Sequence, residues 1–213
     1  FLLLLLHSNG NGRREITTDR LCIILWPDLD KNAAKNARGV TVNRLREFLT
    51  SVGQIELSYS GNVWKLSMDR DLSCDYFDYE RLRKLIGKGS ALERPGYLQE
   101  MVEILRNGPL LSGLNYEWLD SIQANVFDDV VTLLTRELSL MDSIRYPTIC
   151  LSLMDVIAKW DPLNEEAVRH KVRLLDSLGQ HGLAKAIFDH FGAEYRKTFG
   201  KEFPASLGSF LEK

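Results

Sequence analysis

The hydrophobic pattern changes its period at Gly53, and this change constrains the fold more than any other feature of the sequence. Before Gly53, apolar residues recur at helical spacing over residues 31–52. After it, apolar and polar residues alternate over 55–59 and 63–68, on either side of Ser60-Gly61-Asn62. Such alternation around a short turn is typical of a β-hairpin. The sequence therefore predicts a long amphipathic helix that leads directly into a hairpin.

A shorter helix precedes the long one. Thr17, Thr18 and Asp19 form a helix start before an apolar stripe, and Pro27 is expected to end this helix. Asp30 can then cap the long helix. Further upstream, residues 1–7 are expected to form the last turns of another helix, which an Asn- and Gly-rich stretch ends.

The long helix has an apolar face, a polar face and basic flanks. The apolar face is centred on Leu45 and holds Ala34, Thr41, Val42, Phe48 and Leu49. The opposite face holds Asn32, Asn36, Gly39, Val40, Asn43 and Glu47. The basic residues beside that face are Lys35, Arg44 and Arg46. Arg38 points toward the core side, where it would need a partner carboxylate.

From residue 75 onward the pattern is helical, with no convincing strand. The expected helices are 75–86, 95–106, 116–140, 147–160, 164–178 and 183–199, with a short one at 204–211. Glycine and proline residues mark the breaks between them. The last units have the length and punctuation of a degenerate tetratricopeptide-like repeat. We therefore expect two domains, residues 1–70 and 71–213.

Composition is that of an ordinary globular protein, with 45% hydrophobic and 26% charged residues. This excludes a disordered tail, a collagen-like repeat and a disulfide scaffold. The chain has 27 basic and 29 acidic residues, so any contact with DNA must be local. Residues 1–70 carry 10 basic and 7 acidic side chains, whereas 71–213 carry 17 and 22. This asymmetry favours a nucleic-acid-facing segment in the first domain.

The cysteines and the apolar runs indicate a cytoplasmic protein. Cys22, Cys74 and Cys150 are far apart and odd in number, as expected of thiols in a reducing compartment. The longest apolar run, residues 1–6, is far shorter than the roughly 20 residues of a membrane helix. Because the chain does not begin with Met, we expect a soluble, cytoplasmic piece of a longer protein, without membrane contact of its own.

No pattern in the sequence predicts catalysis. His7, His170, His181 and His190 match no metal-binding spacing, and the segment 87–90 is too short for a phosphate-binding loop. No serine nucleophile elbow is present, and acidic pairs such as Asp128-Asp129 read as solvated charge. We therefore expect no enzymatic activity, no cofactor and no metal site.

The helix–turn–helix and hairpin over residues 18–68 allow two interpretations. The long helix could lie in a major groove, where Asn pairs with adenine and Arg with guanine, while the hairpin acts as a wing. Alternatively, its polar face simply meets water, and composition alone favours this reading. Gly39 shifts the balance, because a glycine within a helix costs about 1 kcal/mol relative to alanine. An outward glycine is explained if a phosphodiester, a base edge or another helix approaches closely.

Two sets of segments resemble a known family. Residues 18–28, with their Leu-Trp-Pro-Asp end, 36–49, with Asn-Arg-Leu-Arg, and the hairpin 61–66 are similar to the OmpR-type winged-helix DNA-binding domain. Residues 108–119, 160–167 and 178–186 resemble the bacterial transcriptional activator domain. This order resembles that of SARP-type regulators. The resemblance implies a mainly α protein, a winged helix-turn-helix with a β-hairpin wing and a truncated N-terminal part, followed by an all-α tetratricopeptide-like domain.

The resemblance also implies a function and a site. It implies a bacterial transcriptional regulator, by family expectation an activator, that binds promoter DNA through the 31–52 helix. Its helical domain would mediate homodimerisation or contact a partner such as RNA polymerase. Val40 and Arg44 would face bases and Asn43 and Arg46 the backbone. The full set of expected DNA-binding residues is Lys35, Asn36, Gly39, Val40, Asn43, Arg44, Arg46, Asn62 and Lys65.

The chain departs from the family in three respects, and its acidic overall charge, its weak wing and Gly39 keep an alternative open. The wing has Lys65 as its only basic residue, and the family's N-terminal sheet and a receiver domain are missing. The alternative is a tetratricopeptide-like interaction scaffold whose winged helix no longer binds DNA.

Overall fold

The computed structural model describes residues 1–6, 15–53, 55–68 and 74–212, and its contacts divide the chain into two compact units. The first unit comprises Phe1–Cys74 with Asn115–Ile122, and the second comprises Asp75–Leu114 with Gln123–Lys213. The expected domain boundary after residue 70 falls in the segment 69–73, which lies outside the described residues. No pattern in the sequence predicted that Asn115–Ile122 would group with the first unit.

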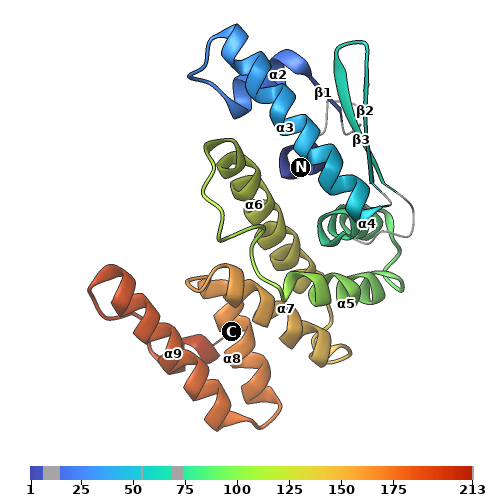
Figure 1. The fold of residues 1–213 in the computed structure, drawn as a ribbon. Coiled ribbons are helices and arrows are strands. Elements are labelled where there is room, and N and C mark those ends of the chain that lie inside the picture. Colours follow the sequence, from blue (N-terminus) through green and yellow to red (C-terminus); the bar gives the residue numbers. More distant parts are fainter. Residues whose placement is uncertain (7–14, 54, 69–73, 213) are drawn as a thin grey trace. The chain divides into compact units, whose positions relative to one another are not determined.

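The first unit combines three helices with a small antiparallel sheet (Figure 1). Its helices are α1 (Leu2–Leu6), α2 (Thr18–Leu25) and α3 (Lys31–Val52), and its strands are β1 (Glu15–Thr17), β2 (Ile55–Ser60) and β3 (Val63–Met68). The strand order is β1-β3-β2. Strand β1 was not predicted, because three residues are too few for an alternating pattern. Its pairing with β3, with Ile16 opposite Trp64, defines it.

The start and end of α2 and α3 follow the predicted signals. The Thr17 side chain accepts a hydrogen bond from the Arg20 amide at 3.3 Å, and α2 ends just before Trp26-Pro27. The Asp30 carboxylate accepts hydrogen bonds from the amides of Asn32 at 2.8 Å and Ala33 at 3.0 Å. These bonds use donors that the first turn of a helix leaves unpaired. The prediction of a helix over 31–52 is confirmed.

Replacing the cap should destabilise α3 in a pH-dependent way. The hydrogen bonds from the Ala33 and Asn32 amides lower the pKa of Asp30. A lowered native pKa means that the cap stabilises the helix above the unfolded pKa of about 3.9 and loses this effect as pH falls through the native value. Asp30→Ala should therefore speed hydrogen exchange at Asn32 and Ala33 at pH 7, and the difference from wild type should shrink at acidic pH. Equal exchange at pH 7 would show that the cap is not needed.

The buried stripe of α3 is narrower than predicted. Ala34, Val42 and Leu49 are buried, whereas Phe48 is 55% exposed and Thr41 is also exposed. The prediction that these last two lie in the core is wrong. The reason is geometric, because α2 and β2 contact α3 along the strip through the three buried residues, and positions 41 and 48 lie at its edge.

The hairpin has the predicted turn and is joined to the start of α2. Ser60 pairs with Val63, and Gly61 and Asn62 have φ values of 58° and 66°. Two successive positive φ angles identify the twist-matched turn that tight hairpins prefer. The Asn62 carbonyl accepts a hydrogen bond from the Thr18 amide at 3.0 Å, and the indole N–H of Trp64 donates to Oγ1 of Thr18 at 3.1 Å.

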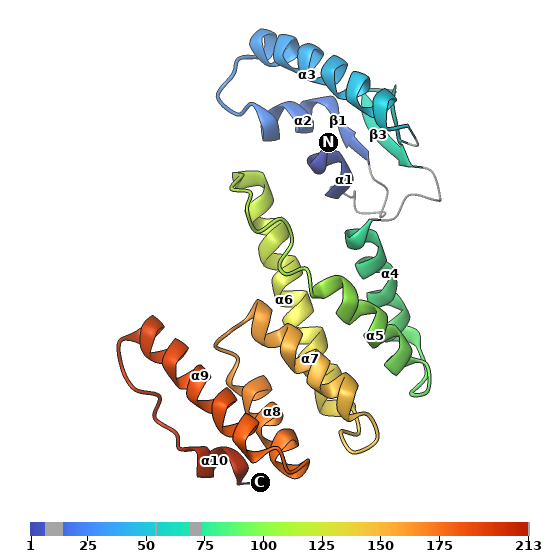
Figure 2. The ribbon, with the colours of Figure 1, turned by 60° about the horizontal axis from the view of Figure 1, so that its bottom comes forward.

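The second unit is a series of helical hairpins (Figure 2). Its helices are α4 (Asp75–Lys88), α5 (Arg94–Leu105), α6 (Glu117–Leu140, whose first turns belong to the first unit), α7 (Pro147–Trp160), α8 (Glu165–Ser177), α9 (His181–Phe199) and α10 (Leu207–Leu211). Each corresponds to a predicted helix, with ends that differ by at most a few residues. The prediction of a mainly helical chain with a β-hairpin is confirmed, and β1 adds a third strand to that hairpin.

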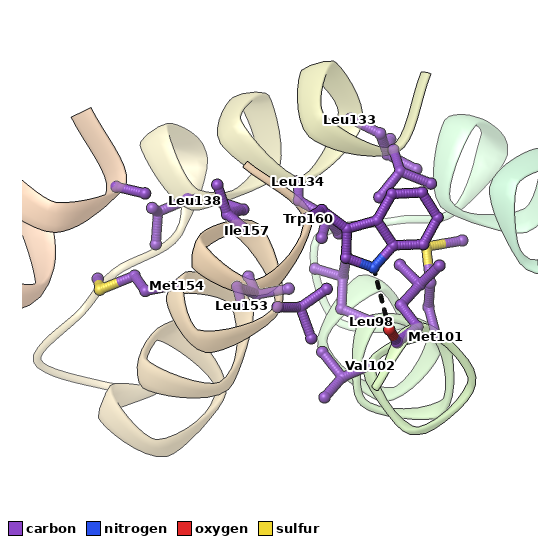
Figure 3. Packing of buried hydrophobic residues seen from close by; sticks show 14 of the residues in the cluster. Leu98, Met101, Val102, Leu133, Leu134, Leu138, Leu153, Met154, Ile157 and Trp160 are labelled. Carbon is purple, nitrogen blue, oxygen red and sulfur yellow. Dashed lines mark hydrogen bonds between the residues drawn. The ribbon is translucent and has the colours of Figure 1, made fainter. Parts of the chain in front are cut away.

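Two clusters form the core of the second unit. In the larger one, leucines of α6 pack against apolar residues of α5 and α7, and the indole N–H of Trp160 donates to the Leu105 carbonyl at 3.0 Å (Figure 3). That bond satisfies the one polar atom of a buried indole. The smaller cluster joins α8, α9 and α10 through Val172, Phe191 and Phe210. Phe199, at the end of α9, is 54% exposed.

Candidate nucleic-acid interface

The outward face of α3 carries most of the predicted DNA-binding residues. Asn36, Asn43 and Arg44 are exposed, and Val40 is 53% exposed. A Cβ built on Gly39 would meet nothing within 4 Å, so the backbone is open to solvent there. The structure therefore brings amide, guanidinium and apolar groups together with a bare stretch of backbone on one helix face.

The basic residues of α3 are available for an external anion. Lys31, Lys35, Arg38 and Arg44 form no ion pair with another residue in the part of the chain that the structure describes. Lys35 and Arg44 are exposed on opposite flanks of the outward face, as the helical wheel predicts. Long cationic side chains beside a helix in a groove can reach phosphates on either side. Glu47 lies on the same outward face and is the one acidic residue of α3.

Arg46 lies over the hairpin. Its guanidinium carbon is 5.7 Å from the centre of the Trp64 ring, and Tyr59 packs on the same indole with ring centres 4.4 Å apart. A cation over an aromatic face is stabilised by about 0.5–1 kcal/mol at an exposed site. Arg46 therefore joins α3 to the wing, and its charge stays at the exposed edge between them.

The wing is short, and both of its predicted DNA-binding residues have neighbours within the unit. The Asn62 side chain accepts a hydrogen bond from the Tyr59 hydroxyl at 3.4 Å, while its carbonyl bonds to Thr18. Lys65 is exposed and lies opposite Glu15 in the β1–β3 register. The sequence could not place Glu15 there, because strand β1 was not predicted.

Metal and membrane features are absent from the described residues. Across 1–6, 15–53, 55–68 and 74–212, no three His, Cys, Asp or Glu side chains lie close enough to hold a metal ion. Among the helices of these same segments, none is both long enough and apolar enough to cross a bilayer.

A helix–turn–helix with a three-stranded sheet, followed by helical hairpins, is consistent with a winged-helix unit and a second, helical unit. Among solved structures, the chain is similar to Mycobacterium tuberculosis EmbR in complex with a low-affinity phosphopeptide. The TM-score is 0.60 and the sequence identity is 16%, over 99% of this chain and 56% of that chain. This likeness concerns the fold, and the chain spans about half the length of EmbR. Searches with family models and among curated proteins give no match.

Proposed function

We propose that the chain is a sequence-specific DNA-binding transcriptional regulator, with α3 lying in the major groove. One observation carries the proposal: the outward face of α3 presents Asn36, Asn43 and Arg44 around an open Gly39. Asparagine pairs in bidentate fashion with adenine and arginine with guanine, so these side chains suit the reading of base edges. The EmbR-like fold supports the same function.

The proposed mechanism is binding rather than chemistry. The helical unit would pair two protomers or contact a partner such as RNA polymerase, and activation of transcription is the expected outcome. The 10 basic and 7 acidic side chains of residues 1–70 provide modest attraction to DNA, so affinity should fall with salt along a shallow slope.

Fluorescence anisotropy tests the proposal directly. The chain would be titrated into labelled DNA from upstream of its own gene and into random duplex, at two salt concentrations. Tighter binding to the upstream DNA that persists in the higher salt supports a sequence-reading regulator. Equal affinity for both duplexes, or no binding, contradicts it.

Gly39→Ala should separate stability from DNA affinity. Nothing lies within 4 Å of the added methyl group, and alanine favours a helix interior over glycine by about 1 kcal/mol. We expect the variant to raise the free energy of unfolding of the first unit by about that amount and to weaken binding to upstream DNA. Thermal unfolding and anisotropy measure the two effects.

Unchanged affinity of Gly39→Ala for upstream DNA would show that DNA does not approach the backbone at Gly39. Gly87→Ala in α4 is a matched control, because its site is equally open.

A protein-interaction scaffold is the second candidate, and the wing favours it. Lys65 is the one basic residue of the described hairpin 55–68, and the hairpin turn is bonded to Thr18, so the wing offers little charge to a DNA backbone. A scaffold of this kind would bind neither duplex in the anisotropy experiment. Circular dichroism would show that the chain is nevertheless folded.

A further inference from the structure

A groove runs between α2 and α3 within the first unit, and its size suits a small molecule. Its volume is about 450 Å³, within the range of roughly 300–1,000 Å³ that is usual for small-molecule sites. The wall from α2 and the following turn is mainly apolar and includes Ile23, Trp26 and Leu29. Ile23 is 60% exposed and Leu29 is 43% exposed, so this wall is an uncovered apolar surface.

The opposite wall is cationic. Lys31, Lys35 and Arg38 are one turn apart along α3, and all three line the groove. None of them pairs with a carboxylate elsewhere in the described residues. Asp19 is the acidic residue of the lining, so positive charge exceeds negative charge by two within the groove.

Arg38 is the most informative of the three cations. A partner carboxylate was expected for Arg38 on the core side of α3, but none is present among the described residues, and its side chain is half-buried in the groove lining. A guanidinium group presents its donors in a fork that matches a carboxylate. No hydrogen bond, ion pair or ring contact of Arg38 with another described residue occupies this fork. The groove thus places a guanidinium group beside an uncovered apolar wall.

We propose that this groove binds a small carboxylic acid with an apolar body. Arg38 and Lys35 would hold the carboxylate, and Trp26 and Ile23 would cover the apolar part. This binding goes beyond the proposed function, because it requires no DNA. It would also tie up Lys35, a residue placed in the DNA interface, and so gives the ligand a direct route to lower DNA affinity.

Cysteine labelling of the full chain provides the test, with octanoate as the probe. Cys22 lines the groove and is half-buried, whereas Cys74 is also half-buried but lies outside it. Iodoacetamide labelling, followed by mass spectrometry of each cysteine, gives the protection of Cys22 against octanoate concentration. Cys74 serves as the internal control. Octanol, which has the same chain length and no charge, tests the need for the carboxylate.

We expect octanoate to protect Cys22 saturably and to leave Cys74 unprotected, with octanol about tenfold weaker. Arg38→Gln and Lys35→Gln should each raise the half-protecting octanoate concentration about tenfold. Lys84→Gln on the surface of α4 should leave it unchanged. If Arg38→Gln fails to fold, the exposed Lys35→Gln decides the question.

Three results would overturn the proposal: no protection of Cys22 by octanoate, equal protection by octanol, or an unchanged half-protecting concentration in Lys35→Gln. Protection by random duplex alone would assign the groove to DNA phosphates and would overturn it as well. Since the octanoate arms contain no DNA, their failure is distinct from a failure of DNA binding.

Discussion

Arg44→Ala is expected to weaken binding to upstream DNA by roughly 1–3 kcal/mol, or about fivefold to 150-fold, as measured by fluorescence anisotropy. The reason is that Arg44 is exposed on the reading side of α3 and forms no ion pair with the described residues, so its guanidinium is free to bind a guanine edge. The affinity of the Arg44→Ala variant for random duplex should change much less.

Lys35→Ala is the matched comparison for Arg44. Lys35 is exposed on the other flank of the same helix, and a lysine that contacts phosphate contributes without regard to sequence. We expect its loss to weaken binding to both duplexes alike and to reduce the salt slope by about one. An equal loss on both duplexes for Arg44→Ala would instead make Arg44 a phosphate contact.

Leu134→Ala is expected to lower the free energy of unfolding of the second unit by about 3 kcal/mol. Leu134 of α6 is fully buried in the cluster that joins α5, α6 and α7 (Figure 3), so the shortened side chain leaves a cavity that rigid helices fill only partly. Denaturant unfolding followed by circular dichroism measures the change.

Leu140→Ala is the control for shortening a leucine side chain of α6 that is not buried. Leu140 ends the same helix and is 65% exposed, so its truncation should change stability by less than about 0.5 kcal/mol. Similar destabilisation by both variants would contradict the assignment of Leu134 to the core.

The sequence predicted the helices and strands better than it predicted the tertiary contacts between them. Each helix of α2–α10 has a local signal, such as the cap at Asp30 or the break at Pro147, and these signals do not depend on the rest of the chain. Strand β1 has no such signal, because its three residues become a strand only through pairing with β3. The position of Glu15 opposite Lys65 was therefore out of reach of sequence reasoning.

The candidate site shows the same limit. Helical periodicity was enough to place Asn36, Gly39 and Asn43 outward and Arg38 inward on α3. It could not show that Phe48 is exposed, because the width of the buried stripe depends on which elements cover it. It also could not place Arg46 over Trp64, since that contact joins a helix to a strand whose register the sequence does not specify.

Strand β1 precedes α2 and α3 along the chain and its partner β3 follows them, so the pairing of β1 with β3 closes a chain loop that contains both helices. Long-range pairing of this kind must wait until the intervening helices have folded close to their final places, so it slows folding compared with the local hairpins of the second unit. The same closure holds both ends of the helix pair. A backbone cut at the exposed turn around Asp28 would therefore leave two fragments that the sheet can still bring together, which makes this turn a natural place to split the chain for complementation.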